Sequence, residues 1–384
     1  MKERYTKFLV LLVTIILISA IVSASMSQKA IDASSSRGEK RLISPGVSNF
    51  DKISYRLKGC KITHELNDAI ALKCPEGVQI QGAFEDEVYQ IMDMDANTQI
   101  NADDVWNISY TGAGVTIAVL DTGIDTDNPE LITSIADGKG FGYATYEDDN
   151  GHGTHVSGII TADGVGGTPV GFAKGASPDA KVWMAKVCNS QGSCYVSDIA
   201  AAIEYVVKGT DGIVNNGDEP AKIMSISLGG GGTNRANCDR DYLASKVNWA
   251  VSNGVTVVAA AGNTANRVSS PACASKAIAV GAVSKSDVRA SWSGTGLALD
   301  IMAPGVSIYS TLPNTTYASW SGTSMATPHI SAVVSLLRQK NPTLTDSQIK
   351  NALYKTAKDL GNTGWDKYNG WGRVDALRAI NYIQ

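Results

Sequence analysis

From residue 112 onward, short apolar runs alternate with longer segments that have the periodicity of a helix. The strand-like runs are rich in β-branched residues and alanine and cover 115–120, 181–187, 222–228, 255–260 and 277–283. The helix-like segments cover 156–162, 198–208, 242–253 and 324–339. Strands that alternate with helices in this way pair in parallel and are covered by helices on both faces. The pattern therefore predicts an α/β fold with a mainly parallel sheet between helices.

A further helix is predicted near the C-terminus by a capping pattern. Thr345 precedes the apolar positions Ile349, Leu353 and Ala357, and Gln348 follows it by three residues. At this spacing the two polar side chains can accept each other's backbone N–H groups, which defines a capping box. We expect the terminal helix to begin at Thr345.

The N-terminal segment has the pattern of an export signal. Basic side chains precede Phe8, the run 8–22 carries no charge, and small residues follow at 23–25. This order is typical of a secretory signal peptide, which we assign to residues 1–24. The alternative is a membrane anchor retained at the cell surface, because about 17 apolar residues is the lower limit for a spanning helix.

Residues 25–98 are expected to form a linker and a small α+β module. The serine-rich segment 25–48 has no apolar periodicity and is typical of a linker. Short alternating segments predict strands at 53–57, 68–73 and 88–92. Cys60 and Cys74 flank the turn expected between the first two strands. A module of this size has a poor core, so a disulfide between them is expected in an exported chain.

The composition narrows the class of protein. Hydrophobic residues make up 43% of the 384 residues and charged residues 18%, and 33 basic against 37 acidic side chains give a net charge of -4. A chain this apolar and this close to neutral is neither a disordered tail nor a dedicated nucleic-acid binder. The 38 glycines have no collagen-like period and indicate a globular protein with many tight turns.

Three sequence blocks place polar residues where a strand ends or a helix begins. Asp121 ends an apolar run and is followed closely by a turn glycine. His152 lies in Gly-His-Gly-Thr-His, and Ser324 lies in Ser-Gly-Thr-Ser-Met-Ala-Thr-Pro, each at the start of a predicted helix. Parallel sheets bind ligands at the carboxyl ends of their strands, so these side chains are candidates for a common site. Pro328 lies inside the helix predicted over 324–339, where proline is normally disfavoured. Such an exception beside polar residues is typical of a functional site.

These blocks resemble those of the subtilases, the subtilisin-like serine peptidases, and the resemblance extends over residues 99–384. Asp, His and Ser follow one another in the family's chain order. The resemblance implies a three-layer subtilisin-like peptidase domain over 99–384. It also implies a serine endopeptidase that hydrolyses proteins through an acyl-enzyme intermediate and requires no cofactor for this chemistry.

The chemistry of the side chains agrees with the roles that the resemblance implies. A serine hydroxyl is a weak nucleophile at neutral pH, so Ser324 requires a base, and an imidazole titrates near that range. We expect His152 to be the base and Asp121 to orient it and stabilise its charged form. His155 is a rival base, because it lies three residues further along the same helix. A zinc site of His152 and His155 is a weaker alternative, since neither the HExxH spacing nor a third ligand is evident.

The tetrahedral intermediate of acyl transfer requires hydrogen-bond donors for its oxyanion. Asn263 ends the block Ala-Ala-Ala-Gly-Asn, which matches the family segment whose asparagine amide donates to the oxyanion. The backbone N–H of Ser324 is the expected second donor. The alternative interpretation of Asn263 is an ordinary turn asparagine after glycine.

Two further segments resemble the family's substrate-binding segments. Ser227, Leu228 and Gly229 resemble the segment whose backbone pairs with an extended peptide. Ala260 and Gly262 are small and imply an open first specificity pocket, which predicts broad specificity with large apolar side chains accepted. These blocks contain no acidic residue, so they do not indicate a preference for substrates with basic side chains.

The even number of cysteines allows complete pairing in an exported chain. Cys188 and Cys194 bracket a short segment between a predicted strand and a predicted helix. Cys238 follows a glycine run, and Cys273 follows the block that contains Asn263. Among the possible pairings we choose the disulfides Cys60–Cys74, Cys188–Cys194 and Cys238–Cys273.

The small module before residue 99 resembles the family's inhibitory propeptide. This implies that it assists folding and blocks the cleft until the enzyme cuts itself near residues 91–99. We expect a monomer that acts on polypeptides, with its own propeptide as an intramolecular inhibitor and no nucleic-acid partner. A membrane partner is expected only if the N-terminal segment is retained.

Calcium commonly ties down surface loops in this family, and Glu130 and Asp163 are candidate ligands. A set of about six to eight oxygen ligands is not evident in the sequence, so structural calcium is possible and the metal site is unassigned. Taken alone, each residue is interpreted as a solvated surface carboxylate.

Two other functions fit the sequence less well than a peptidase. An esterase of the α/β-hydrolase type is disfavoured by the chain order of the triad and by the absence of a G-x-S-x-G elbow. A catalytically inactive binding module is disfavoured by the complete set of Asp121, His152, Ser324 and Asn263.

Overall fold

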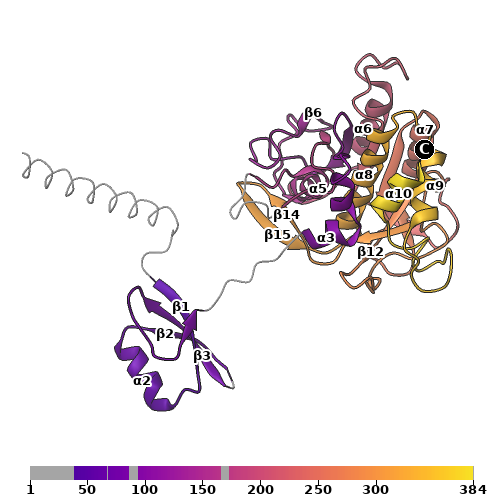
Figure 1. Cartoon of the computed structure of the whole chain (residues 1–384). Coiled ribbons are helices and arrows are strands. Elements are labelled where there is room, and N and C mark those ends of the chain that lie inside the picture. Colours follow the sequence, from indigo (N-terminus) through magenta and orange to yellow (C-terminus); the bar gives the residue numbers. More distant parts are fainter. Residues whose placement is uncertain (1–38, 67, 86–93, 166–172, 384) are drawn as a thin grey trace, which may run out of the picture. The chain divides into compact units, whose positions relative to one another are not determined.

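The chain forms two compact units (Figure 1), and a computed structural model describes residues 39–66, 68–85, 94–165 and 173–383. The first unit falls within Met1–Gln90 and the second within Ile91–Gln384. The second unit therefore begins before the boundary predicted at residue 99. Two predictions, the signal peptide over 1–24 and a strand over 88–92, lie outside the described residues. No helix in the described part of the chain is long and apolar enough to cross a bilayer.

The small unit is an antiparallel sheet with a helix packed on it. The strands lie in the order β2-β3-β1-β4, and Tyr55 of α2 joins an apolar core with Leu42 and Leu72. The predicted disulfide Cys60–Cys74 lies in this core. The elements are β1 (Glu39–Pro45), α2 (Asn49–Leu57), β2 (Lys61–Glu65), β3 (Ala69–Pro75) and β4 (Phe84–Glu85).

The prediction of a linker over 25–48 is wrong for residues 39–45, which form β1. This strand pairs with β3 on one side and β4 on the other. Leu42 and Ser44 are buried while Arg41 is exposed. The period of two is therefore present, but charged and polar neighbours conceal it in the sequence.

The prediction of a strand over 53–57 is also wrong, because these residues belong to helix α2. Ser48 caps this helix: its hydroxyl accepts the N–H of Asp51 at 3.3 Å, and the Asp51 carboxylate accepts the N–H of Ser48 at 2.9 Å. Alternation of apolar and polar residues over only five positions is a weak signal for a strand. The capping box of Ser48 and Asp51 is the stronger signal, and it favours a helix.

The large unit is built on a seven-stranded parallel sheet, which confirms the predicted α/β fold. Its strands lie in the order β13-β12-β10-β8-β5-β7-β6, so the strand order reverses at β5. Ligands bind at the carboxyl ends of strands beside such a reversal. The strands are β5 (Thr116–Asp121), β6 (Ile135–Gly140), β7 (Lys181–Lys186), β8 (Ile223–Ile226), β10 (Thr256–Ala260), β12 (Ile278–Val283) and β13 (Ile301–Pro304).

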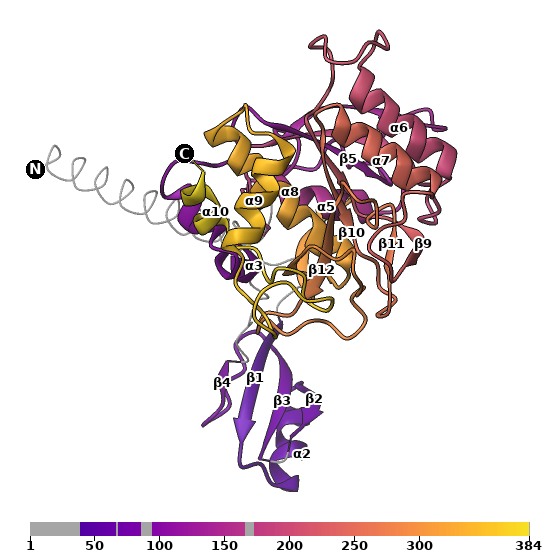
Figure 2. The ribbon, with the colours of Figure 1, turned by 90° about the vertical axis from the view of Figure 1, so that its right-hand side faces the viewer.

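Helices cover both faces of this sheet and complete a three-layer arrangement (Figure 2). Ile117 and Val119 of β5 enter the core beneath α5 and α8, whereas Ala118 and Leu120 enter the core beneath α6 and α7. Burial on both faces explains why these strands are continuously apolar in the sequence. The helices are α3 (Met94–Gln99), α4 (Ala102–Trp106), α5 (His152–Thr161), α6 (Val196–Lys208), α7 (Tyr242–Ser252), α8 (Thr323–Lys340), α9 (Asp346–Thr356) and α10 (Ala376–Tyr382).

The predicted helices and their observed bounds agree closely except at two places. Thr345 caps α9 through the predicted capping box with Gln348, but α10 follows, so α9 is not the terminal helix. Helix α5 begins at His152 rather than at Val156, because its polar first turn hides it in the sequence. Two short antiparallel pairs were not predicted: β9 (Gly230–Thr233) with β11 (Val268–Ser270), and β14 (Ile308–Leu312) with β15 (Thr316–Trp320).

Asp287 joins distant parts of the large unit. Its carboxylate forms ion pairs with Lys358 at 2.7 Å and with Arg373 at 2.8 Å, and it accepts a hydrogen bond from the Gln99 amide at 2.7 Å. The guanidinium of Arg373 also donates to the carbonyl of Gln99. Helix α3 is further attached through the buried side chain of Asn97, which donates to the carbonyl of Lys174 at 2.7 Å.

Candidate active site

The carboxyl end of β5 holds an aspartate against a histidine. Asp121 is the last residue of β5 and is 1% exposed, while His152 is the first residue of α5. Nδ1 of His152 lies 2.7 Å from Oδ1 of Asp121, which also accepts the N–H of Thr122 at 2.8 Å. Because a carboxylate oxygen accepts here, Nδ1 carries the imidazole proton and Nε2 has a free lone pair.

The surroundings of His152 raise its pKa above the ordinary value of 6.5. Burial alone disfavours the charged ring, but the charge and hydrogen bond of Asp121 outweigh it, with a further contribution from the charge of Asp148. A proton received at Nε2 is therefore stabilised by the aspartate. The pair can act as a base that becomes an acid later in the same reaction.

The loop before His152 is held by Asp148, which the sequence analysis missed. One oxygen of Asp148 accepts the Thr122 hydroxyl at 2.9 Å and the Gly151 N–H at 2.9 Å. The other accepts the N–H and hydroxyl of Thr154 at 2.9 and 2.6 Å. Gly151 precedes α5 and has no side chain to cap it, so Asp148 supplies the acceptor for this helix start. The acidic run just before Gly151 is the signal that was overlooked.

Lys186 is a second residue that the sequence analysis missed. It ends β7 beside Asp121 and is 3% exposed. Its ammonium group donates to the carbonyl of Thr122 and forms an ion pair with Asp149 at 2.6 Å. These contacts hold the turn that follows β5 and help to fix the position of Asp121.

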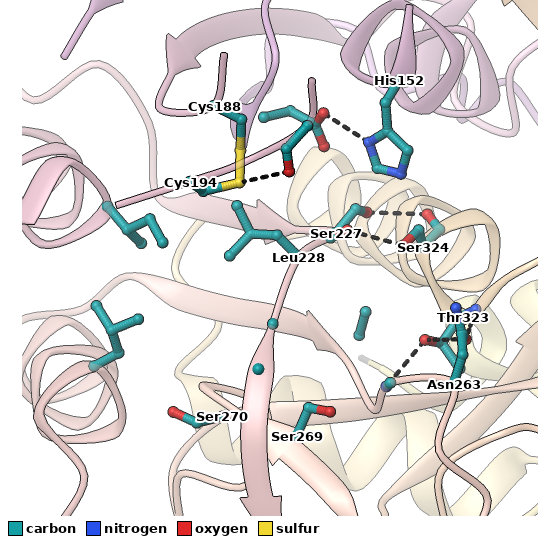
Figure 3. A pocket seen from close by; sticks show the side chains of 18 of the residues that line it. His152, Cys188, Cys194, Ser227, Leu228, Asn263, Ser269, Ser270, Thr323 and Ser324 are labelled. Carbon is teal, nitrogen blue, oxygen red and sulfur yellow. Dashed lines mark hydrogen bonds and ion pairs between the residues drawn. A yellow bond between two sulfur atoms is a disulfide. The ribbon is translucent and has the colours of Figure 1, made fainter. Parts of the chain in front are cut away.

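Ser324 lies in the first turn of α8, across the cleft from His152 (Figure 3). Its hydroxyl donates to the carbonyl of Ser227 at 2.8 Å, and the Ser227 hydroxyl donates to the carbonyl of Ser324 at 3.0 Å. N–H groups in the first turn of a helix have no acceptor within the helix. The Ser324 N–H is therefore available to an anion, with the favourable dipole of a helix start behind it.

Asn263 is oriented by Thr323, the residue before Ser324. Its Oδ1 accepts the backbone N–H and the hydroxyl of Thr323 at 3.0 and 3.1 Å, and the same hydroxyl accepts the N–H of Gly262 at 3.0 Å. An N–H can only donate, so the acceptor end of the amide must face Thr323. The NH₂ group of Asn263 is left as a donor beside the Ser324 N–H.

A cleft of about 580 Å³ connects these groups. Its lining includes the predicted substrate-binding residues Ser227, Leu228, Gly229, Ala260 and Gly262. The structure thus gathers every predicted site residue, namely Asp121, His152, Ser324, Asn263 and these five, around a single cleft.

Ser269 lies against Gly262 in the lining of this cleft. Gly262 has φ +91°, and a Cβ there would lie 2.1 Å from the hydroxyl of Ser269. Glycine at this position therefore makes room for the side chain of Ser269. Ser269, Ser270 and Arg267 also line the cleft, and none of them was predicted from the sequence.

His155, the rival base, has a different environment. It is fully buried, its Nε2 lies 3.0 Å from the carbonyl of Ala318, and its ring stacks on Trp320 at 4.6 Å. Burial lowers its pKa to about 4, so it stays neutral near pH 7. It does not line the cleft that holds Ser324. His152 is therefore the better placed base.

The described residues contain no group of three or more His, Cys, Asp or Glu side chains that could hold a metal ion. The interpretation of Glu130 as a solvated surface carboxylate is wrong, because Glu130 is fully buried and accepts the hydroxyl of Tyr317 at 2.5 Å. Asp163 is partly buried, and its carboxylate accepts the N–H of Val165 at 3.0 Å. Neither residue belongs to such a group within the described residues.

All six cysteines are paired, and one of the three disulfides lies in the lining of the cleft. The six cysteines form Cys60–Cys74, Cys188–Cys194 and Cys238–Cys273, the three pairs chosen from the sequence. Both Cys188 and Cys194 line the cleft. Cys273 follows β11 and lies close to Ser269, whose carbonyl accepts its N–H at 2.9 Å.

Comparison with known proteins gives a consistent result. A model of the subtilase family matches residues 112–372. Subtilisin Savinase of Lederbergia lenta is 41% identical over 287 residues, which cover 73% of this chain and 96% of that protein. M-protease of Shouchella clausii (strain KSM-K16) is 39% identical over 287 residues, or 73% of this chain and 68% of its own length. Subtilisin E of Bacillus subtilis (strain 168) is 37% identical over 292 residues, with 73% and 70% covered.

Proposed function

Since the chain belongs to the subtilase family and is a serine endopeptidase, we propose that Asp121, His152 and Ser324 form its catalytic triad and that Asn263 donates to the oxyanion. The observation that carries this proposal is the 2.7 Å contact between His152 and Asp121 at a cleft also lined by Ser324 and Asn263. The chain acts on polypeptides and requires no cofactor for the chemistry.

Hydrolysis proceeds through an acyl-enzyme. Ser324 Oγ attacks the peptide carbonyl carbon while its proton passes to Nε2 of His152, and Asp121 stabilises the resulting imidazolium. The oxyanion accepts hydrogen bonds from the Asn263 amide and the Ser324 N–H. Collapse of the intermediate expels the amine, which takes the proton from His152. Water then attacks the acyl group by the same sequence of proton transfers and restores the Ser324 hydroxyl.

Peptide binding helps to activate the nucleophile. In the free enzyme the Ser324 hydroxyl donates to the carbonyl of Ser227. An extended peptide that pairs with the 227–229 backbone brings its own N–H to that carbonyl. The Ser324 hydroxyl then turns toward Nε2 of His152, where it can be deprotonated.

A serine-directed fluorophosphonate probe tests the proposed function directly. We expect the mature enzyme to be labelled at Ser324, with loss of casein hydrolysis in proportion to the labelling. Labelling at another residue, or casein hydrolysis that survives complete labelling of Ser324, would overturn the assignment. An enzyme that cleaves simple esters but not casein would support an esterase instead.

The pH dependence of kcat/KM should report the raised pKa of His152. The base must be neutral to accept the Ser324 proton, so activity falls as the pH drops through the pKa of His152 in the free enzyme. Because this pKa lies above 6.5, we expect the midpoint of the acidic limb above pH 6.5. A stopped assay with a peptide amide across pH 4.5 to 9 checks this.

His155 provides the control for the pH experiment. Its pKa of about 4 is too low to cause an acidic limb in that range. We expect a His155→Gln variant to lose stability but to keep the midpoint of the wild type. A midpoint below pH 6.5 in the wild type, or one that moves with His155→Gln, would contradict the role given to His152.

Arg267 adds an electrostatic element to the predicted broad specificity. It is exposed, lines the cleft and forms no ion pair within the described residues. We expect peptides with glutamate beside this guanidinium to be cleaved better than matched glutamine peptides by roughly two- to fivefold at low salt, the size of an exposed ion pair. A cleavage profile of glutamate and glutamine peptides measures this preference.

The Arg267 variants separate charge from shape. Arg267→Ala should remove the preference for glutamate, and Arg267→Lys should retain most of it. An unchanged glutamate-to-glutamine ratio in Arg267→Ala would show that the guanidinium does not reach the substrate.

We also propose that the chain is made as a secreted, self-processing precursor. In this proposal residues 1–24 direct export, and the small unit serves as an inhibitory propeptide. The cut lies before Met94, since α3 is attached to the large unit through Asn97 and Gln99. This narrows the predicted region of 91–99 to its N-terminal side. The mature enzyme acts as a monomer outside the cell.

A further inference from the structure

Helix α8 lacks one backbone hydrogen bond at the nucleophile. In an α-helix the N–H of residue i+4 donates to the carbonyl of residue i. Pro328 occupies this position relative to Ser324 and has no N–H to donate. The carbonyl of Ser324 therefore has no partner within its own helix, although a buried carbonyl without a partner is costly.

The hydroxyl of Ser227 takes the place of the missing N–H. It donates to the Ser324 carbonyl at 3.0 Å, and Ser227 is 3% exposed. The carbonyl of Ser227 simultaneously accepts the Ser324 hydroxyl at 2.8 Å. Figure 3 shows both contacts between the two residues. One residue thus contacts both the main chain and the side chain of the nucleophile.

A second serine pair offers a comparison within the same interface. Ser225 lies two residues before Ser227 and so faces the same side of the β8 segment. Its hydroxyl accepts the hydroxyl of Ser331 at 2.8 Å, two turns along α8 from Ser324. Both pairs attach α8 to the same segment, but only the Ser227 contact reaches Ser324.

We propose that the Ser227 hydroxyl is a positioning group for the nucleophile, and this inference rests on the proposed function of Ser324. It replaces the helix hydrogen bond that Pro328 removes and fixes the first turn of α8. The Ser324 N–H and Cα are thereby held where the oxyanion and the attacking oxygen require them. The Ser227 carbonyl, which is offered to the substrate, is the main-chain group and does not depend on this hydroxyl.

A double-mutant cycle between Ser227 and Pro328 tests the proposal. We expect Ser227→Ala to lower kcat by about tenfold with KM nearly unchanged, because the loss affects the reacting geometry and not the substrate-binding carbonyl. Ser227→Thr keeps the hydroxyl and should restore most of kcat. Pro328→Ala supplies an N–H at residue 328. In that background, Ser227→Ala should change kcat by less than about twofold, because the carbonyl has regained a helical partner.

Ser225→Ala is the matched control. It removes a buried serine contact of the same helix on the same segment and should lower the melting temperature with little effect on kcat. The proposal is overturned if Ser227→Ala leaves kcat unchanged, if it acts mainly on KM, or if its effect is the same with and without Pro328. Fluorophosphonate labelling of the wild type is run in parallel. Its failure would remove the proposed function itself, whereas an additive cycle in a labelled, active enzyme would remove only the role of Ser227.

Discussion

Replacing Ser324 by alanine is expected to abolish peptide hydrolysis and to leave the precursor uncut. Ser324 supplies the hydroxyl that we propose His152 activates at this cleft, so the variant lacks the nucleophile. Loss of the nucleophile costs roughly 10⁶-fold in kcat in subtilisin itself. The residual rate should be that of water attacking a bound peptide near the Asn263 amide. Turnover of a peptide amide and the mass of the secreted chain are the two measurements.

The mass of the same variant tests self-processing by a measurement that is separate from peptide turnover. We expect Ser324→Ala to accumulate at the mass of the precursor without its signal peptide, while Ser321→Ala, an exposed serine in the same block, matures normally. N-terminal sequencing of the mature wild type should place its first residue at or before Met94. Normal maturation of an inactive Ser324→Ala chain would assign the cut to another peptidase. Appreciable peptide hydrolysis by that chain would refute the triad.

Replacing Asn263 by alanine should reduce kcat by about 10² to 10³ and leave KM nearly unchanged, because the amide meets the oxyanion only in the transition state. The Thr323 N–H and hydroxyl orient this amide in the free enzyme, so its donor end requires no reorganisation during the reaction. Asn263 is exposed, and we expect the variant to fold and to be labelled slowly by a fluorophosphonate.

Asn266 supplies the control for this prediction. It lies in the same exposed loop, where its backbone N–H donates to the carbonyl of Thr264 at 2.7 Å. Asn266→Ala should keep kcat within about threefold of the wild type, as expected for a surface substitution. Equal losses in the two variants would indicate disturbance of the loop rather than loss of an oxyanion donor.

Much of the large unit was predictable because its signals are local. The apolar strands β5, β7, β8, β10 and β12 are buried on both faces and therefore read as continuous apolar runs. The residues Asp121, His152, Asn263 and Ser324 lie in blocks whose chain order is itself informative. Asp121, Ser227 and Asn263 stand at the ends of β5, β8 and β10, which are consecutive in the sheet, and this brings their blocks together.

The missed features depend on contacts between distant residues. Asp148 caps α5 by contacts that reach back to Thr122 and forward to Thr154; the acidic run marks a candidate cap for the helix, but the partners of Asp148 depend on the fold. Ser269 lines the cleft on strand β11, whose pairing with β9 is not evident in the sequence. The substrate role of the Ser227 backbone was expected, but its hydroxyl contact with Ser324 becomes apparent only once α8 is packed on β8.

The contacts of Asp287 are relevant to how well the enzyme resists cleavage by other molecules of the same enzyme. A peptidase can cleave other copies of itself where an extended segment enters a neighbour's cleft, and loose chain ends are the usual point of entry. Asp287 ties Gln99 near the start of the large unit to Lys358 and Arg373 near its end. One carboxylate thus holds together segments near the start and near the end of the large unit. We therefore expect resistance to mutual digestion in concentrated solution to fall when this carboxylate, which is absent from the lining of the cleft, is removed.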